Sequence, residues 1–160
     1  MNTTRIAIIV GIILVALLGV WGFLNLRPLL ADLFDTPKGT VTVNGKTINV
    51  LLADTQKKQE KGLSGKKSLP ENQGMLFVFQ EADYPSFWMK EMQFPIDIIF
   101  INDTTVTTVY ENVAPPADEN TQLPLYKPTT PSDKVLELNA GQSQTLGIKP
   151  GTTLTIYLKK

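Results

Sequence analysis

The sequence contains no histidine and no cysteine among its 160 residues. These absences exclude the nucleophile–histidine systems of serine and cysteine hydrolases, thiol redox chemistry, and the usual ligand sets for zinc, iron and copper. Any catalysis must therefore use carboxylates, lysine or hydroxyl groups, or a hard cation held by oxygen atoms. Without cysteine, disulfides give no information on the cellular compartment. We predict neither a cofactor nor a metal site.

The sequence also lacks an excess of charge of one sign. It has 15 basic and 15 acidic residues, so its formal net charge is zero. Proteins that bind nucleic acid usually carry a basic patch that matches the phosphate charge. Lysines do gather between residues 57 and 67, but a run of charge is more often a solvated helix face than an anion site. Nucleic acid is therefore not predicted as a partner.

One long hydrophobic run stands near the N-terminus. Residues 6–24 carry no charge, and as a helix they would span about 28 Å, close to the hydrocarbon thickness of a bilayer. The residues that follow lack the small-x-small pattern of a cleaved signal peptide, which favours an uncleaved signal anchor. We predict a single-pass transmembrane anchor at residues 1–27, a linker at 28–39 and a separate domain at 40–160. The membrane is thus a predicted partner, through residues 6–24.

The orientation of this anchor is nearly balanced by charge, because Arg5 precedes the run and Arg27 follows it. A short polar tail before a first span is typical of signal anchors, whose following domain is exported. We therefore expect the domain to be extracytoplasmic.

Residues 40–160 are predicted to be mainly β, a compact distorted sandwich or barrel with one or two short helices. Asn44-Gly45 between two alternating runs indicates a hairpin. Asp54 or Thr55 can begin a short helix and Gly62 can end it. The segment GQSQTLGIKPG at 141–151, flanked by glycines, indicates a helical turn. A loop with several prolines follows residue 113. Further strands are predicted at 74–79, 86–92, 97–102, 105–113, 134–140 and 152–160.

Two charged residues interrupt the apolar stretch from 85 to 102. If Gln93-Phe94 forms a tight turn, alternation places Lys90 opposite Asp97, on one face of a hairpin with Trp88. One interpretation is an ion pair that fixes the strand register and adds little net stability. The other is that the three side chains contact a ligand.

Glu137 likewise interrupts an apolar strand, and a pair formed by Asp97 and Glu137 is compatible with carboxylate-based glycoside hydrolysis. This signal is weak, since most β-proteins offer such pairs. The candidate binding residues are Trp88, Lys90, Asp97, Glu137, Lys61 and Tyr126.

Several short motifs resemble those of the DUF192 family of uncharacterised proteins. They are KGLSG at 61–65, GMLFVF at 74–79, FWMK at 87–90, PIDIIFI at 95–101, VLELNAG at 135–141 and LGIKPG at 146–151. The resemblance covers residues 41–158 and implies a mainly β domain that often follows a signal peptide or membrane anchor. It implies no activity. As signature positions it implies Trp88, Met89, Lys90, Pro95 and Asp97, supported by Gly62, Gly74, Glu137 and Gly141.

The chain departs from the family pattern at two places. Lys61 stands where arginine is usual, which keeps the charge but loses the bidentate fork. Glu91-Met92 replaces the usual asparagine and threonine, so a polar site built on those side chains is not expected here.

Three functions remain open at this stage. The first is a membrane-anchored extracytoplasmic binding or accessory module for a small molecule, a glycan or an envelope protein. The alternative is a carboxylate-dependent enzyme that acts on cell-envelope polymers, although no recognised catalytic motif is present. The third is a structural subunit of a membrane complex. The first is favoured, because the lack of histidine and cysteine narrows the catalytic repertoire.

Overall fold

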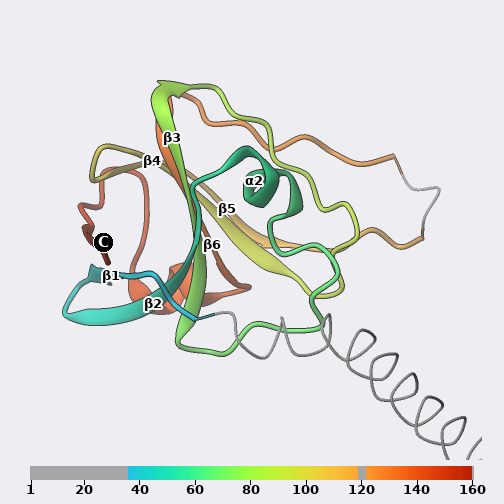
Figure 1. Cartoon of the computed structure of the whole chain (residues 1–160), viewed down its shortest axis with the longest axis horizontal. Coiled ribbons are helices and arrows are strands. Elements are labelled where there is room, and N and C mark those ends of the chain that lie inside the picture. Colours follow the sequence, from blue (N-terminus) through green and yellow to red (C-terminus); the bar gives the residue numbers. More distant parts are fainter. Residues whose placement is uncertain (1–35, 119–121, 160) are drawn as a thin grey trace, which may run out of the picture. The chain divides into compact units, whose positions relative to one another are not determined.

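Seven strands form one mixed sheet in the computed structural model, which describes residues 36–118 and 122–159 (Figure 1). Across the sheet the strands run in the order β5-β4-β6-β3-β2-β1-β7. Neighbouring strands are antiparallel except β2 and β3, which are parallel. The strands are β1 (Gly39–Val43), β2 (Lys46–Ala53), β3 (Gln73–Asp83), β4 (Ile96–Asn102), β5 (Thr105–Val113), β6 (Ser132–Asn139) and β7 (Thr155–Leu158).

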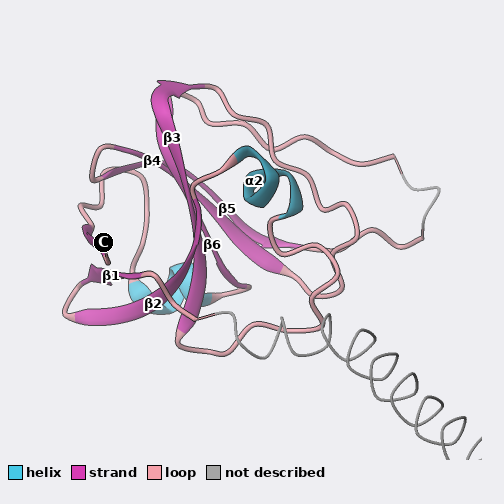
Figure 2. Cartoon of the chain, in the orientation of Figure 1, coloured by secondary structure: helices cyan, strands magenta, loops and turns pink. Residues whose placement is uncertain are grey.

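Two short helices, α2 (Gln56–Lys61) and α3 (Gln142–Leu146), accompany the sheet in the described part of the chain (Figure 2). The mainly β fold with one or two short helices is thus confirmed. The predicted anchor at residues 6–24 lies outside the described residues. Within residues 36–118 and 122–159, no helix is both long enough and apolar enough to cross a membrane.

Local sequence signals account for the first elements. Asn44 and Gly45 have φ angles of 50° and 76°, the positive values that a two-residue hairpin turn requires, so the predicted hairpin is confirmed. The hydroxyl of Thr55 accepts a hydrogen bond from the backbone N–H of Lys58 and caps α2, which ends at Gly62. Because parallel strands need a crossover connection, α2 lies between β2 and β3 in the chain.

The sheet curls until its two ends meet. The N–H of Val106 at the start of β5 donates to the carbonyl of Thr152 at 2.9 Å, and the N–H of Leu154 donates to Thr104 at 2.8 Å. β5 is one end of the sheet and residues 151–154 lead into β7, the other end. These bonds wrap the sheet around one of its two faces.

The side chains consequently form two cores, one on each face. The core inside the curl, called here the enclosed core, contains Val41, Val43, Ile48, Val50, Leu76, Ile99, Ile101, Val106, Leu136, Leu138, Ile148 and Leu154. The core on the other face, called the covered core, contains Leu51, Ala53, Leu63, Leu69, Met75, Phe77, Met89, Met92, Ile96, Ile98, Phe100, Val113 and Val135. α3 leads into Ile148 on the enclosed core, whereas α2 leads into Leu63 on the covered core.

The predicted strand at residues 86–92 is wrong. This segment makes an isolated bridge, in which the N–H groups of Phe87 and Tyr126 each donate to the other residue's carbonyl at 2.9 Å. It then turns at Glu91, whose φ is 58°. The apolar side chains of Phe87, Met89 and Met92 pack on the covered core as a docked loop, a role that alternation alone cannot distinguish from a strand.

Asp97 organises the opposite side of the sheet. Its carboxylate is fully buried and accepts hydrogen bonds from the N–H of Asn112 at 2.8 Å, the N–H of Gly141 at 3.1 Å, and both the N–H and the hydroxyl of Ser143 at 2.8 and 2.7 Å. Gly141 has no side chain to cap α3, so the carboxylate from β4 accepts from the N–H groups of Gly141 and Ser143 at the start of that helix. A buried polar group left without a hydrogen-bond partner costs about 1–3 kcal/mol. The four hydrogen bonds avoid this cost for the carboxylate and for its donors, so Asp97 can be fully buried.

Candidate functional site

A pocket of about 300 Å³ opens over the covered core, between α2 and the docked loop at residues 85–92. Its lining includes Phe77 of β3 and Glu137 of β6, which belong to the sheet, and Trp88 of the docked loop. The volume lies at the lower end of the range of about 300–1,000 Å³ that small-molecule sites occupy. We call it the Glu137 pocket.

The α2 wall of the pocket is fixed to the sheet by Gln59. Its side-chain Nε2 donates to the carbonyl oxygens of Ala53 at 3.3 Å and Val78 at 2.8 Å. Gly62, which ends the helix, has a φ of 47°, and a Cβ there would lie 3.2 Å from Cζ of Phe77. The glycine therefore allows the turn after α2 to approach the Phe77 ring closely.

The docked loop forms the other wall and is held by aromatic packing. The ring of Phe87 meets that of Phe77 edge to face, with centroids 4.9 Å apart, and that of Phe100 at 5.7 Å. Met89 is also buried, whereas Trp88 between them is 53% exposed. The buried neighbours thus hold the Trp88 side chain at the pocket without burying it.

The two walls are joined beyond the end of α2. The hydroxyl of Ser64 donates to the carbonyl of Lys90 at 2.9 Å, and the N–H of Gly65 donates to the carbonyl of Glu91 at 3.0 Å. These bonds connect the turn after α2 to the docked loop, so the pocket is formed by two segments that support each other.

Glu137 is the buried polar group of the pocket. It lies on β6 in the middle of the sheet, paired with Met75 of β3 on one side and Ile98 of β4 on the other, and is 5% exposed. Within the described residues its Oε2 has no hydrogen-bond partner. Burial disfavours the charged form and raises the pKa of Glu137 from 4.5 to about 8. At neutral pH this side chain is therefore mainly an uncharged carboxylic acid.

Three of the predicted site residues line this pocket. Glu137 lies within it, and Lys61 and Trp88 come from its two walls. Tyr126 does not line it, but its backbone holds Phe87 through the bridge described above, and its ring packs against Tyr110 at 5.2 Å.

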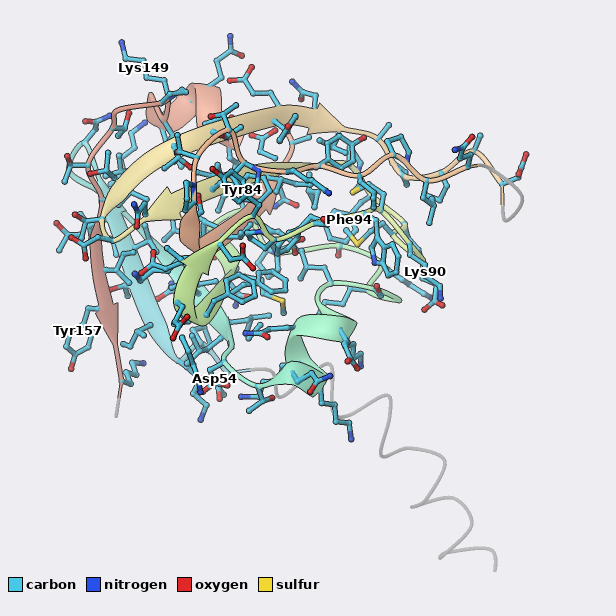
Figure 3. All side chains as sticks on the ribbon, turned by 90° about the horizontal axis from the view of Figure 1, so that it is seen from above. Asp54, Tyr84, Lys90, Phe94, Lys149 and Tyr157 are labelled. Atoms are coloured by element: carbon cyan, nitrogen blue, oxygen red, sulfur yellow. The ribbon has the colours of Figure 1, made fainter. Side chains whose placement is uncertain are left out.

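The predicted pairing of Lys90 with Asp97 is wrong. Lys90 lies on the turn of the docked loop and is exposed, at the margin of the molecule in Figure 3. It borders a separate hollow together with Gln93. Asp97 is buried and faces the enclosed core, where backbone N–H groups and Ser143 bind it. The pairing fails because the segment that carries Lys90 is not a strand of the sheet.

The predicted pairing of Asp97 with Glu137 is also wrong. Asp97 is in register with Leu138, which belongs to the enclosed core, and successive side chains of a strand point to opposite faces. Glu137 therefore points to the covered core. A sheet separates the two carboxyl groups, so they cannot flank one glycosidic bond. In the described part of the chain, no cluster of three or more potential protein ligands could hold a metal ion.

The prediction missed the aromatic lining of the pocket, which Phe77, Phe79 and Phe87 provide. Alternation within 74–79 carried a signal for Phe77 and Phe79, because it places them on the same face of their strand. No comparable signal identified Phe87, whose position depends on how the loop docks.

Comparisons with known proteins identify relatives of the whole domain. The model of the DUF192 family, described as Uncharacterized ACR, matches residues 39–156. A crystal structure of a protein of unknown function from Novosphingobium aromaticivorans is 33% identical, with a TM-score of 0.66, and the match covers 72% of this chain and 83% of that one. A protein from Sinorhizobium meliloti, described as a candidate transcription regulator, is also 33% identical, with a TM-score of 0.65 and coverage of 76% and 95%. No curated protein matches the chain.

The raised pKa of Glu137 predicts that stability falls with rising pH. The carboxyl ionises near 4.5 when unfolded but near 8 when folded, so between these values the unfolded state binds fewer protons. The contribution of the neutral acid is complete below pH 4.5 and is lost as pH rises through 8. The unfolding free energy of Glu137→Gln, relative to that of the unsubstituted protein, should therefore increase by roughly 3–4 kcal/mol as pH rises from 5 to 8. Urea unfolding of the two proteins at both pH values measures this difference.

Glu60→Gln is the matched control, because Glu60 borders the same pocket but is exposed. Its unfolding free energy relative to the unsubstituted protein should hardly change with pH. If the Glu137→Gln difference is as flat as that of the control, Glu137 is not a buried neutral acid.

Proposed function

This chain belongs to the DUF192 family, and we propose that its domain is a binding module that takes a small organic molecule into the Glu137 pocket. One observation carries the proposal: a buried carboxyl group lines an aromatic pocket of ligand size, and one of its oxygen atoms has no hydrogen-bond partner among residues 36–118 and 122–159. Pockets of this kind, with apolar walls and a few polar groups, are typical of small-molecule sites.

The energetic cost of Glu137 supports a binding role. Its neighbours in the sheet, Met75 and Ile98, are apolar, and an apolar side chain at position 137 would complete the covered core. Burying a polar group without a hydrogen-bond partner costs about 1–3 kcal/mol by protein mutational data. Groups that break the packing rules at such a cost are concentrated at functional sites. A ligand that satisfies the carboxyl group would recover this free energy.

The arrangement favours binding over catalysis. The other acidic residue that lines the pocket, Glu60, is exposed and accepts a hydrogen bond from Gln56 at 2.9 Å. The carboxylate pair that an envelope-polymer hydrolase would use is divided between the two faces of the sheet, as described above. A binding module therefore agrees better with these contacts than an enzyme that uses two carboxylates.

We also propose that residues 6–24 anchor the domain in the membrane and place it outside the cytoplasm. The support is the uncharged run itself, of a length that matches the bilayer core, and the short polar tail that precedes it. In this position the pocket would meet molecules of the cell envelope.

A ligand screen tests the binding proposal. The full-length chain, purified in detergent, is screened by thermal shift against small amines, sugars and carboxylic acids, and affinities of the hits are measured by calorimetry. Trp88→Ala should weaken the hits roughly tenfold, because an aromatic wall contributes on the order of 1 kcal/mol or more to such a contact.

Tyr157→Ala is the matched control for this variant. Tyr157 is also a largely exposed aromatic residue, 63% exposed, but it lies on β7 and does not line the pocket. It should leave every affinity within about twofold. A screen without hits, or hits that lose the same affinity in both variants, would overturn the binding proposal.

The proposed topology predicts which C-terminal reporters work. Alkaline phosphatase fused after residue 160 should be active and membrane-bound in bacterial cells, since this enzyme requires the oxidising periplasm for its disulfides. Green fluorescent protein at the same site serves as the complementary reporter, because it fluoresces when it folds in the cytoplasm. Strong fluorescence with inactive phosphatase would reverse the proposed orientation, and reporter activity in the soluble fraction would contradict the anchor.

A further inference from the structure

We propose that the ligand of the Glu137 pocket is an organic cation, an amine whose ammonium group binds the carboxyl of Glu137. This inference rests on the proposed function and adds the chemical class of the ligand. It depends on three features of the pocket. An oxygen atom of Glu137 has no hydrogen-bond partner in the described structure, three polar wall residues already donate hydrogen bonds within the protein, and aromatic rings line the pocket.

The pocket contains a buried acceptor that the protein leaves unsatisfied. Oε2 of Glu137 is buried without a hydrogen-bond partner among the described residues. An ammonium group brings up to three N–H donors, and an ionised pair in a site of low dielectric forms short and strong hydrogen bonds. Once Glu137 is ionised, this oxygen can only accept hydrogen bonds, so the partner that it lacks is a donor.

Three polar residues of the pocket walls already donate hydrogen bonds within the protein. Gln59 donates to the carbonyls of Ala53 and Val78, while Gln56 donates to Glu60 and the hydroxyl of Ser64 to the carbonyl of Lys90. A carboxylate ligand would therefore meet few free donors on these three residues. Besides the exposed Lys61 and Ser86 it would meet the buried acid of Glu137. These contacts disfavour an anionic ligand.

The aromatic residues of the pocket favour a positive charge. Phe77 and Phe87 lie edge to face beside the carboxyl group, and Trp88 adds its exposed ring at the pocket wall. The face of an aromatic ring carries partial negative charge and attracts a cation within about 6 Å by about 0.5–2 kcal/mol. A flat or apolar body attached to the amine would pack on the same rings.

The other charged groups that line the pocket are Glu60 and Lys61 of α2, and both are exposed. The β3 residues and the docked-loop residues that line the pocket carry no formal charge. Because the charges of Glu60 and Lys61 are opposite, they largely cancel. Glu137 therefore determines whether the pocket prefers a positive or a negative ligand.

The inference predicts a proton released on binding. In the free protein the acid is mainly neutral at pH 7, since its pKa is about 8. Binding of a protonated amine ionises it, so that the carboxylic acid and the ammonium ion give a carboxylate–ammonium pair and one proton goes to the buffer. Affinity should therefore rise about tenfold for each pH unit between 6 and 7.5. A neutral ligand that hydrogen-bonds the uncharged acid would instead bind with nearly constant affinity between pH 6 and 7 and would lose affinity as pH rises through 8.

Calorimetry with three probes of similar shape tests this inference. The full-length chain in detergent is titrated with 2-phenylethylamine, 2-phenylethanol and 3-phenylpropionate at pH 6, 7 and 8, in buffers of different ionisation enthalpy. At pH 7 and above we expect the amine to bind more tightly than the other two probes. Close to one proton should be released per amine bound at pH 6–7. Glu137→Gln should abolish the proton release and weaken the amine at pH 8 by at least about tenfold, while binding of the alcohol persists and shows that the variant is folded.

Glu81→Gln makes the same chemical change at an exposed position of β3 that does not line the pocket, and should change amine affinity by less than about threefold. If the alcohol binds better than the amine and weakens with rising pH, the cation inference fails while the binding proposal stands. If the propionate binds best, the inference fails in the same way. If none of the three probes binds and the broader screen has no hits, the proposed function itself fails.

Discussion

One constraint governs the candidate site, the position of a carboxyl group on β6, an interior strand of the sheet. β6 is paired with β3 and β4 along its length, so its side chains are buried on both faces. At Glu137 this strand places a titratable group on the covered core with an oxygen atom that has no hydrogen-bond partner in the described structure. In the proposed function, the pocket, its aromatic lining and the docked loop all serve to bind a ligand that hydrogen-bonds this oxygen atom.

The described part of the chain contains two buried acids, and their surroundings give them opposite roles. Asp97 accepts four hydrogen bonds, which satisfy N–H groups at a β5 bend and at the start of α3. It is a structural group, whose oxygen atoms find their hydrogen-bond partners within the protein. Glu137 lies one pleat away on the other face and has only desolvation acting on its pKa. Burial alone does not distinguish these roles, whereas the partners of each oxygen atom do.

Sequence patterns predicted most of the fold but not the assembly of the site. The Asn44-Gly45 turn and the Thr55 and Gly62 limits of α2 follow from local backbone preferences, so they could be predicted without tertiary contacts. The docked loop around Phe87 could not, because its alternation is produced by packing on the covered core and not by a ladder of strand hydrogen bonds. The same error paired Lys90 with Asp97. Glu137 could be identified because a charged residue within an apolar run is evident from the sequence. Its role could be inferred only after the structure showed on which face of the sheet it lies.

The ionisation state of Glu137 is the central physical claim, and nuclear magnetic resonance measures it directly. Full-length protein with carbon-13 at the glutamate side-chain carboxyl is titrated from pH 4 to pH 10, and Glu137→Gln identifies the signal by its disappearance. The account predicts that this one carboxyl titrates near pH 8 in the ligand-free protein. Titration near the ordinary glutamate value of 4.5 would show that the group is solvated or paired, and would contradict the account.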